Sequence, residues 1–135
     1  MLKKKKNKIF LKKNKLKNFK IKNIVLFRIF STFNNTIITL TNAIGDTLYW
    51  STSSNINFKP YKKSMTSSSQ IAAERVGKFA ISLGYKYSKI IINGIGFGRD
   101  YSIRGVFNSG INVISVCDVT PNPHNGCKLK KIRRN

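Results

Sequence analysis

The balance of charge constrains this chain more than any other feature. Twenty-six Lys and Arg residues face only four Asp and Glu residues in 135 positions, which gives a formal net charge of +22. Like charges repel, so a compact state with this excess is disfavoured unless an anionic partner neutralises it. The sequence therefore predicts a nucleic-acid partner, because phosphates supply a dense row of negative charge.

The N-terminal segment, residues 1–22, holds eleven Lys and no acidic residue. Alone it cannot bury enough apolar surface to offset the entropy of ordering. We expect it to be an arm that orders against phosphate, with Lys12, Lys13 and Lys15 among its RNA contacts. A solvated tail without a role is the simpler alternative. A cleaved import peptide is disfavoured, because such peptides favour Arg and Ser. A globular domain over 23–120 and a basic tail over 121–135 complete the expected organisation.

Composition also limits the cellular setting. No apolar run is long enough to span a bilayer, and Cys117 and Cys127 do not make a disulfide framework. About half of the chain is Lys, Asn, Ile, Phe or Tyr, whose codons are rich in A and T. This usage predicts an AT-rich genome, as in many organelles, and favours a mitochondrial setting. A plastid and the cytoplasm of an AT-rich bacterium are the alternatives.

Three strands in succession are predicted in the first half of the chain. Residues 24–33 are rich in β-branched and aromatic side chains, residues 36–41 alternate apolar with polar, and residues 47–52 follow a turn at 42–46. The short connections predict an antiparallel meander.

A helix is predicted after a loop at residues 53–66. Ser67 is a candidate N-cap, and Gln70, three residues later, would complete a capping box. Five apolar side chains then follow at helical spacing and are expected to form the buried face: Ala72, Val76, Phe79, Ala80 and Leu83. Gly84 suits the left-handed residue that ends a helix.

The second half of the chain predicts a strand, a helix and a strand. The isoleucine run at 89–93 is typical of a strand buried on both faces. Asp100 is expected to cap a short helix that Gly110 ends, and residues 111–116 form the last strand. The apolar side chains of this helix are Ile103, Val106 and Phe107.

Strands joined through a helix run parallel with a right-handed crossover. The predicted fold is therefore α/β: one domain with a mixed five-stranded sheet, an antiparallel three-strand meander plus two parallel strands, with helices packed on it. Basic extensions flank this domain on both sides. The order of the elements resembles the topology of ribonuclease H-like nucleases.

The loop at residues 58–63 interleaves aromatic and cationic side chains. Aromatic faces stack on unpaired bases, and ammonium groups contact phosphates. Lys59, Tyr61, Lys62 and Lys63 are therefore expected to contact RNA. The alternative is a solvated basic loop with Phe58 tucked into the core.

A glycine-rich turn at residues 94–98 lies between a predicted strand and a predicted helix. Glycines allow another backbone to come close, and a helix N-terminus presents unpaired N–H groups to an anion. The spacing does not match a nucleotide-binding fingerprint. Arg99 raises the expectation of a phosphate contact, and Arg104 lies further along the same helix. A tight turn without a ligand is the alternative.

The residues that could support catalysis or hold a metal are few. The spacing of Cys117, His124 and Cys127 does not match a zinc site, so no metal or cofactor is expected. We expect His124 to bond either the backbone or RNA. The four carboxylates do not supply the ligands of two-metal chemistry, so the nuclease-like topology does not carry nuclease function with it. We therefore do not expect this protein to be an enzyme.

Four stretches together resemble the S-eleven family of small-subunit ribosomal proteins, over about residues 23 to 134. They are Ser-Thr-Phe-Asn-Asn-Thr at 31–36, the glycine turn at 94–100, Ser-Gly-Ile at 109–111, and Asp-Val-Thr-Pro-Asn-Pro-His-Asn-Gly-Cys at 118–127. The last run is highly specific. The chain departs from the family at Cys117, where members often have Arg, and at 128–131, where members often have Arg-Pro-Pro-Lys. The Lys-rich arm lies outside the resemblance.

The resemblance implies a structural constituent of the small subunit that binds its rRNA at the platform, near the mRNA exit path, in translation. It implies neighbouring platform proteins as partners, with mRNA near the exit path as a further one, and no small-molecule substrate. It carries rRNA contact onto the basic loop, Arg99, Arg104 and these residues: Asn34, Asn35, His124, Asn125, Lys128, Lys130, Lys131, Arg133 and Arg134.

Two other functions are weighed against this one. An RNA-processing nuclease of ribonuclease H-like topology would need Asp118 for metal-dependent cleavage. A peripheral protein held on anionic lipid would need an amphipathic N-terminal helix, yet the apolar residues of the arm form no clean helical stripe. We therefore expect no membrane partner.

Overall fold

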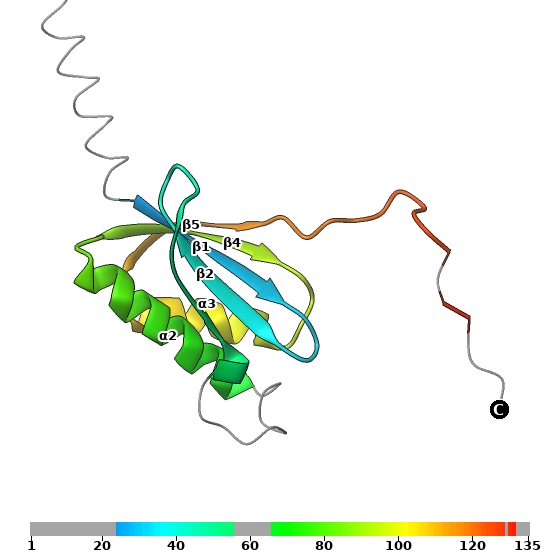
Figure 1. The fold of residues 1–135 in the computed structure, drawn as a ribbon, viewed down its shortest axis with the longest axis horizontal. Coiled ribbons are helices and arrows are strands. Elements are labelled where there is room, and N and C mark those ends of the chain that lie inside the picture. The colour runs from blue at the N-terminus through cyan, green and yellow to red at the C-terminus, as the bar shows by residue number, and fades with distance from the viewer. Residues whose placement is uncertain (1–23, 56–65, 129, 132–135) are drawn as a thin grey trace, which may run out of the picture.

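The computed structural model describes residues 24–55, 66–128 and 130–131. Within these residues, five strands, two α-helices and one short 3₁₀ turn follow one another (Figure 1). In order they are β1 (Ile24–Ser31), β2 (Thr36–Thr41), β3 (Thr47–Thr52), η1 (Ser53–Asn55), α2 (Thr66–Ser82), β4 (Tyr87–Asn93), α3 (Gly98–Asn108) and β5 (Asn112–Asp118).

The five strands form one mixed sheet in the order β3-β2-β1-β4-β5. The meander β1–β2–β3 is antiparallel, whereas β1 pairs with β4, and β4 with β5, in parallel. The strand that comes first in the chain therefore lies at the centre of the sheet. This arrangement confirms the predicted α/β class and the mixed five-stranded sheet.

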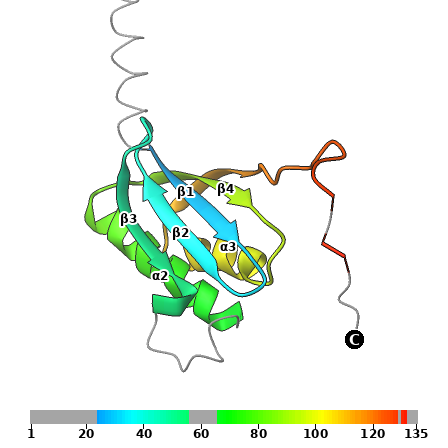
Figure 2. The same cartoon turned by 45° about the vertical axis from the view of Figure 1, so that its right-hand side comes forward.

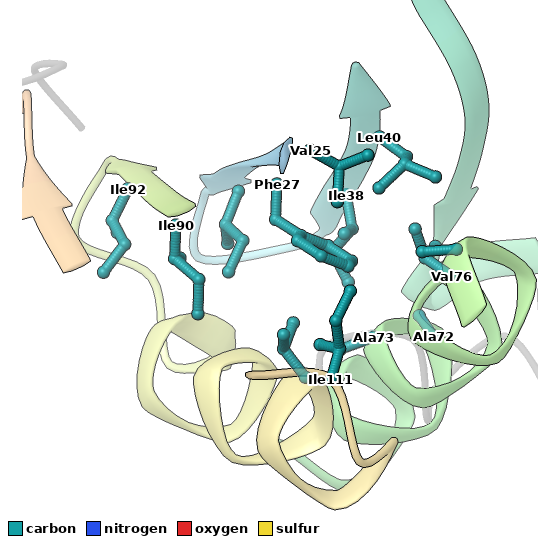
Figure 3. Packing of buried hydrophobic residues seen from close by; sticks show 13 residues of the cluster. Val25, Phe27, Ile38, Leu40, Ala72, Ala73, Val76, Ile90, Ile92 and Ile111 are labelled. Atoms are coloured by element: carbon teal, nitrogen blue, oxygen red, sulfur yellow. The ribbon is translucent and has the colours of Figure 1, made fainter. Parts of the chain in front are cut away.

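Both helices pack on the same face of the sheet (Figure 2). Helix α2 lies against β2 and β3, and α3 lies against β1. The strand residues that point at the helices are mostly apolar, as in Val25 and Phe27 of β1, and these side chains are fully buried (Figure 3). Burying each such side chain contributes about 1.5–3 kcal/mol. This one layer of contacts forms the hydrophobic core.

The prediction that the isoleucine strand is buried on both faces was wrong. In β4, Ile90 and Ile92 are buried beneath the helices, while Ile91 points to the opposite face and is only half-buried. The polar flanks Lys89 and Asn93 share that opposite face, since side chains alternate along a strand. We call this side, away from α2 and α3, the open face; no described helix covers it (Figure 2).

Small residues let the two helices approach each other closely. A Cβ on Gly105 of α3 would collide with the Gln70 carbonyl and with Ala73 of α2. A Cβ on Gly77 of α2 would collide with Ser109 just after α3. Because a well-packed interior does not absorb an added methyl group, these glycines set the distance between the helices.

The predicted bounds and caps of the first helix need two corrections. Helix α2 begins at Thr66, so Ser67 lies inside it, and Gln70 donates to Glu74 at 3.2 Å instead of completing a capping box. Leu83 was expected in the core but lies beyond the helix end and is 49% exposed. The predicted stop is confirmed, since Gly84 has a φ of +85°.

The second helix differs from its prediction in the same way. It begins at Gly98 with Phe97 in the cap position, so Asp100 lies in the first turn and is not the cap. A carboxylate is favourable there because the helix dipole is positive at its N-terminus. Phe107 is half-exposed, whereas Val106 is buried. Gly110, with a φ of +87°, ends the helix as predicted.

Candidate nucleic-acid interface

One end of the sheet gathers several turns, some of which contain candidate contact residues. The β1–β2 turn, η1, the residues that precede α3 and the start of the C-terminal tail all lie there (Figures 1 and 2). Thr36 of β2 accepts a hydrogen bond from Ser69 of α2 at 3.1 Å, which ties the N-terminal part of that helix to the same end.

Asn35 acts as a clamp within this end. Its side-chain Oδ1 accepts hydrogen bonds from the Thr36 backbone N–H at 2.9 Å, the Ser53 hydroxyl at 2.7 Å and the Ser54 hydroxyl at 3.0 Å. These bonds join the β1–β2 turn to η1. Asn34, by contrast, is exposed. The sequence predicted that both residues contact RNA. In the structure, Asn35 also holds two segments of the domain together by hydrogen bonds, whereas the exposed Asn34 does not.

The glycine turn between β4 and α3 packs directly on the end of β1. A Cβ on Gly94 would collide with the carbonyl of Ser31, and one on Gly96 with the carbonyl of Thr32. The Gly96 N–H donates to the Ser31 carbonyl at 3.2 Å. The predicted close approach of another backbone is therefore present, and that backbone belongs to this chain's own β1.

Arg99 is held within the protein. Its Nη1 donates to the Gly94 carbonyl at 3.1 Å, and its Nη2 donates to Asp118 Oδ2 at 2.5 Å. Sequence reasoning assigned Arg99 to phosphate and missed this ion pair with the last residue of β5. The available signal was that Asp118 is the one carboxylate near the end of a predicted strand.

Asp118 also fixes the start of the tail. Its Oδ1 accepts from the Thr120 hydroxyl at 2.6 Å and the Thr120 backbone N–H at 3.0 Å, and the Gly94 N–H donates to Thr120 Oγ1 at 3.1 Å. The Thr120 hydroxyl and then Arg99 lower the pKa of Asp118 from 3.8 to about 2. The carboxylate is therefore ionised at neutral pH. The hydrogen bonds of Asp118 and Thr120 fix the direction in which the tail leaves the domain.

Arg104 is exposed on α3, with its guanidinium carbon 5.4 Å from the centre of the Tyr101 ring. That distance lies within cation–π range. The structure thus separates the two arginines: Arg99 turns toward the end of β5, and Arg104 faces solvent beside an aromatic ring.

Beyond Thr120 the described tail extends away from the sheet (Figure 1). Its candidate contacts are all exposed: His124, Asn125, Lys128, Lys130 and Lys131. Asn125 has a φ of +58°, a left-handed conformation that marks a turn in the tail. The remaining candidates lie outside the described residues: Lys12, Lys13, Lys15, Lys59, Tyr61, Lys62, Lys63, Arg133 and Arg134.

The cations are segregated from the folded body. Eleven of the 26 lie in residues 1–22, three in residues 56–65 and five in residues 119–135, and none of these segments contains an acidic residue. The remaining seven cations share the body with all four Asp and Glu residues, which leaves a body charge of +3. The chain thus combines a nearly balanced fold with strongly basic extensions and one basic loop.

The described residues show no grouping of three His, Cys, Asp or Glu side chains that could hold a metal ion. Cys117 and Cys127 are exposed free thiols. Helices in the described part of the chain are too short or too polar to cross a membrane.

Comparison with known proteins identifies the family of this chain. A family model described as "Ribosomal protein S11" matches residues 25–134, which is most of the chain. The chain belongs to the ribosomal protein S11 family. Members of the S11 family are structural, non-enzymatic constituents of the small ribosomal subunit, so the nuclease alternative has no support.

Relatives in the S11 family come from plastids, mitochondria and bacteria. The chain is 42% identical over 128 residues to small ribosomal subunit protein uS11c of Zygnema circumcarinatum, covering 95% of each protein. It is 44% identical over 104 residues to uS11m of Marchantia polymorpha, covering 77% of this chain and 83% of that one. It is 47% identical over 106 residues to uS11 of Herminiimonas arsenicoxydans, covering 78% of this chain and 79% of that one.

Proposed function

We propose that this chain is a structural component of the small ribosomal subunit that binds small-subunit rRNA at the platform, near the mRNA exit path, beside other platform proteins. The observation that carries the proposal is the segregation of charge. A nearly balanced body serves as a scaffold, and residues 1–22, 56–65 and 119–135 carry 19 of the 26 cations. Phosphate contacts supply most of the affinity in such an interface.

In this proposal the division of the chain follows its chemistry. The arm at 1–22 and the tail at 121–135 lie along phosphates, and the domain at 23–120 orients them. Within the domain, Asn34 at the tip of the β1–β2 turn and Arg104 on α3 are exposed, which supports their role as contacts. Arg99 has two guanidinium nitrogens engaged with Gly94 and Asp118, which directs the tail, and its remaining N–H donors are proposed to contact rRNA.

The decisive experiment is a density map of the small ribosomal subunit that contains this chain. The proposal expects the three basic segments to lie on rRNA at the platform, with Asn34 and Arg104 within contact distance of RNA. Location elsewhere on the particle, or basic segments that face solvent, would overturn it. Proximity of the tail to mRNA is read from the same map with mRNA bound.

We further propose that the chain belongs to a mitochondrial ribosome. The support is its heavy use of residues with A- and T-rich codons. Sequencing the gene with its flanking DNA tests this: a mitochondrial locus of high AT content is expected. A plastid or bacterial locus would refute the assignment and leave the ribosomal role unchanged.

A further inference from the structure

The open face of the sheet has an unusual surface for a side that no described helix covers. Three aromatic side chains from three different strands lie on it, each about half-exposed: Phe30 of β1 at 46%, Trp50 of β3 at 55% and Tyr87 of β4 at 47%. Strand register places them there. Paired residues of neighbouring strands share a face. Arg28 pairs with Thr39, and Thr39 pairs with Trp50; on the other side of β1, Ile24 pairs with Tyr87. The alternate residues of β1, which are buried, point to the opposite face.

Cations lie among these aromatics. Arg28 is two residues before Phe30 on β1, and Lys89 is two residues after Tyr87 on β4; both are exposed. The acidic side chains of the chain all lie elsewhere: Asp46 in the β2–β3 turn, Glu74 on α2, Asp100 on α3, and Asp118 paired with Arg99. The open face therefore has positive charge with no carboxylate side chain to neutralise it.

The open face also has a shallow hollow. Its volume is about 210 Å³, and its lining includes Arg28, Phe30, Ile91 and Asn93. That volume lies below the range of roughly 300–1,000 Å³ typical of small-molecule pockets, so it does not suit an enclosed ligand. It suits a flat group laid on the sheet, with the Asn93 amide and the Arg28 guanidinium able to bond its edge.

From these observations we infer that the open face binds unpaired RNA bases, which stack on Phe30, Trp50 and Tyr87 while Arg28 and Lys89 neutralise the adjoining phosphates. Aromatic side chains on an exposed sheet are a general means of recognising single-stranded RNA. Two other occupants are disfavoured by charge. The Lys-rich residues 1–22 of this chain and the same face of a second copy are both cationic. The inference rests on the proposed function, because it adds a second RNA surface to the basic extensions.

The spacing of the aromatics indicates several bases. Phe30 and Tyr87 are separated by six residues along adjacent parallel strands, about 20 Å at the rise of a strand. Trp50 lies two strands away from β1, about 10 Å across the sheet. No single base reaches two of these rings, so the face would contact an extended single strand and not an isolated nucleotide.

The test uses the full chain and the fluorescence of Trp50, which is the only tryptophan. Oligoadenylate is titrated at raised salt, which suppresses binding through phosphates alone. We expect quenching of Trp50 emission by the single strand but not by an RNA duplex of equal length. Phe30→Leu and Tyr87→Leu should each weaken binding at least about five-fold, the lower bound for loss of one stacked base.

Phe107→Leu is the matched control, because Phe107 is 52% exposed but lies on α3, on the other side of the sheet. Circular dichroism checks that each variant is folded. Unchanged Trp50 emission, equal quenching by duplex, or equal loss in the Phe107 variant would overturn the inference. So would crosslinks from this face to a protein, and not to RNA, in the assembled subunit. Binding of rRNA through the extensions would survive all of these outcomes, so the two proposals fail separately.

Discussion

The guanidinium of Arg99 and the carboxylate of Asp118 connect the first turn of α3 to the last residue of β5, with Nη2 and Oδ2 2.5 Å apart. The pair is partly exposed, so its direct contribution to stability is small. Its importance is positional. Asp118 also holds Thr120, and Thr120 accepts from the Gly94 backbone, so these bonds determine the direction in which the basic tail leaves the sheet.

Acid should weaken this connection at a defined pH. The folded-state pKa of Asp118, about 2, is below its ordinary value of 3.8. The stabilisation is therefore fully present above about pH 4 and is lost as the pH falls toward 2. Asp118→Asn should make the acid-induced loss of stability shallower in that window, measured as the urea midpoint from pH 6 to pH 2. A parent-like pH profile in the variant would contradict the assignment.

The clamp at the β1–β2 turn gives a prediction with a neighbouring control. Asn35→Ala leaves the Ser53 and Ser54 hydroxyls without their shared acceptor and should cost about 1–3 kcal/mol of unfolding free energy. Asn35→Asp keeps an acceptor in place and should cost less. Asn34→Ala, at an exposed site, should stay within about 0.5 kcal/mol. Chemical denaturation of the three variants checks this order, and equal losses at both positions would refute the clamp.

The contact between α2 and α3 depends on the absence of a side chain at Gly105. By helix propensity alone, Gly105→Ala would gain about 1 kcal/mol. Because the new Cβ would collide with the Gln70 carbonyl and Ala73, we expect a net loss of about 1–3 kcal/mol. Gly126→Ala is the control, since its Cβ would come no nearer than 3.4 Å to Pro123. A stabilised Gly105 variant in thermal unfolding would show that the helices are further apart than described.

The tail should account for a measurable share of the salt dependence of rRNA binding. Replacing Lys128, Lys130 and Lys131 by Gln removes up to three phosphate contacts. The slope of log affinity against log salt should then become less negative by about 2–3. The charge-matched control replaces Arg75, Lys78 and Lys86 by Gln, exposed cations of the folded body. Filter binding over a salt series measures the slope for each variant. Equal changes of slope in the two triple variants would show that the position of the cations in the chain does not matter.

The sequence alone predicted those elements that are defined by a pattern of neighbouring residues. The strands at 36–41 and 47–52 were predicted to the residue, because alternation and a turn at 42–46 define them. Gly84 and Gly110 were identified as helix ends for a similar reason, since each adopts the positive φ that glycine tolerates. The spacing of its apolar residues also predicted which face of α2 is buried. The exception is Leu83, which lies beyond the end of the helix.

The rest depended on contacts between distant segments. Ser67 resembled a cap, but the helix begins one residue earlier. Whether β4 has one buried face or two depends on how many layers of helix cover the sheet, which its isoleucines do not encode. Arg99 and Asp118 are nineteen residues apart, and the grouping of Phe30, Trp50 and Tyr87 requires the register of four strands.

The place of β1 has a consequence for how the chain is made. Its parallel neighbour β4 begins at Tyr87, 63 residues after Ile24, so the middle of the sheet cannot close while that later stretch is still inside the ribosome that synthesises it. Until then the meander offers the β1 edge that later pairs with β4, and an apolar side that α2 covers over β2 and β3 but that α3 does not yet cover over β1; both features favour aggregation. A product terminated before Tyr87 would keep that edge permanently, which makes early termination more harmful to this protein than loss of the tail.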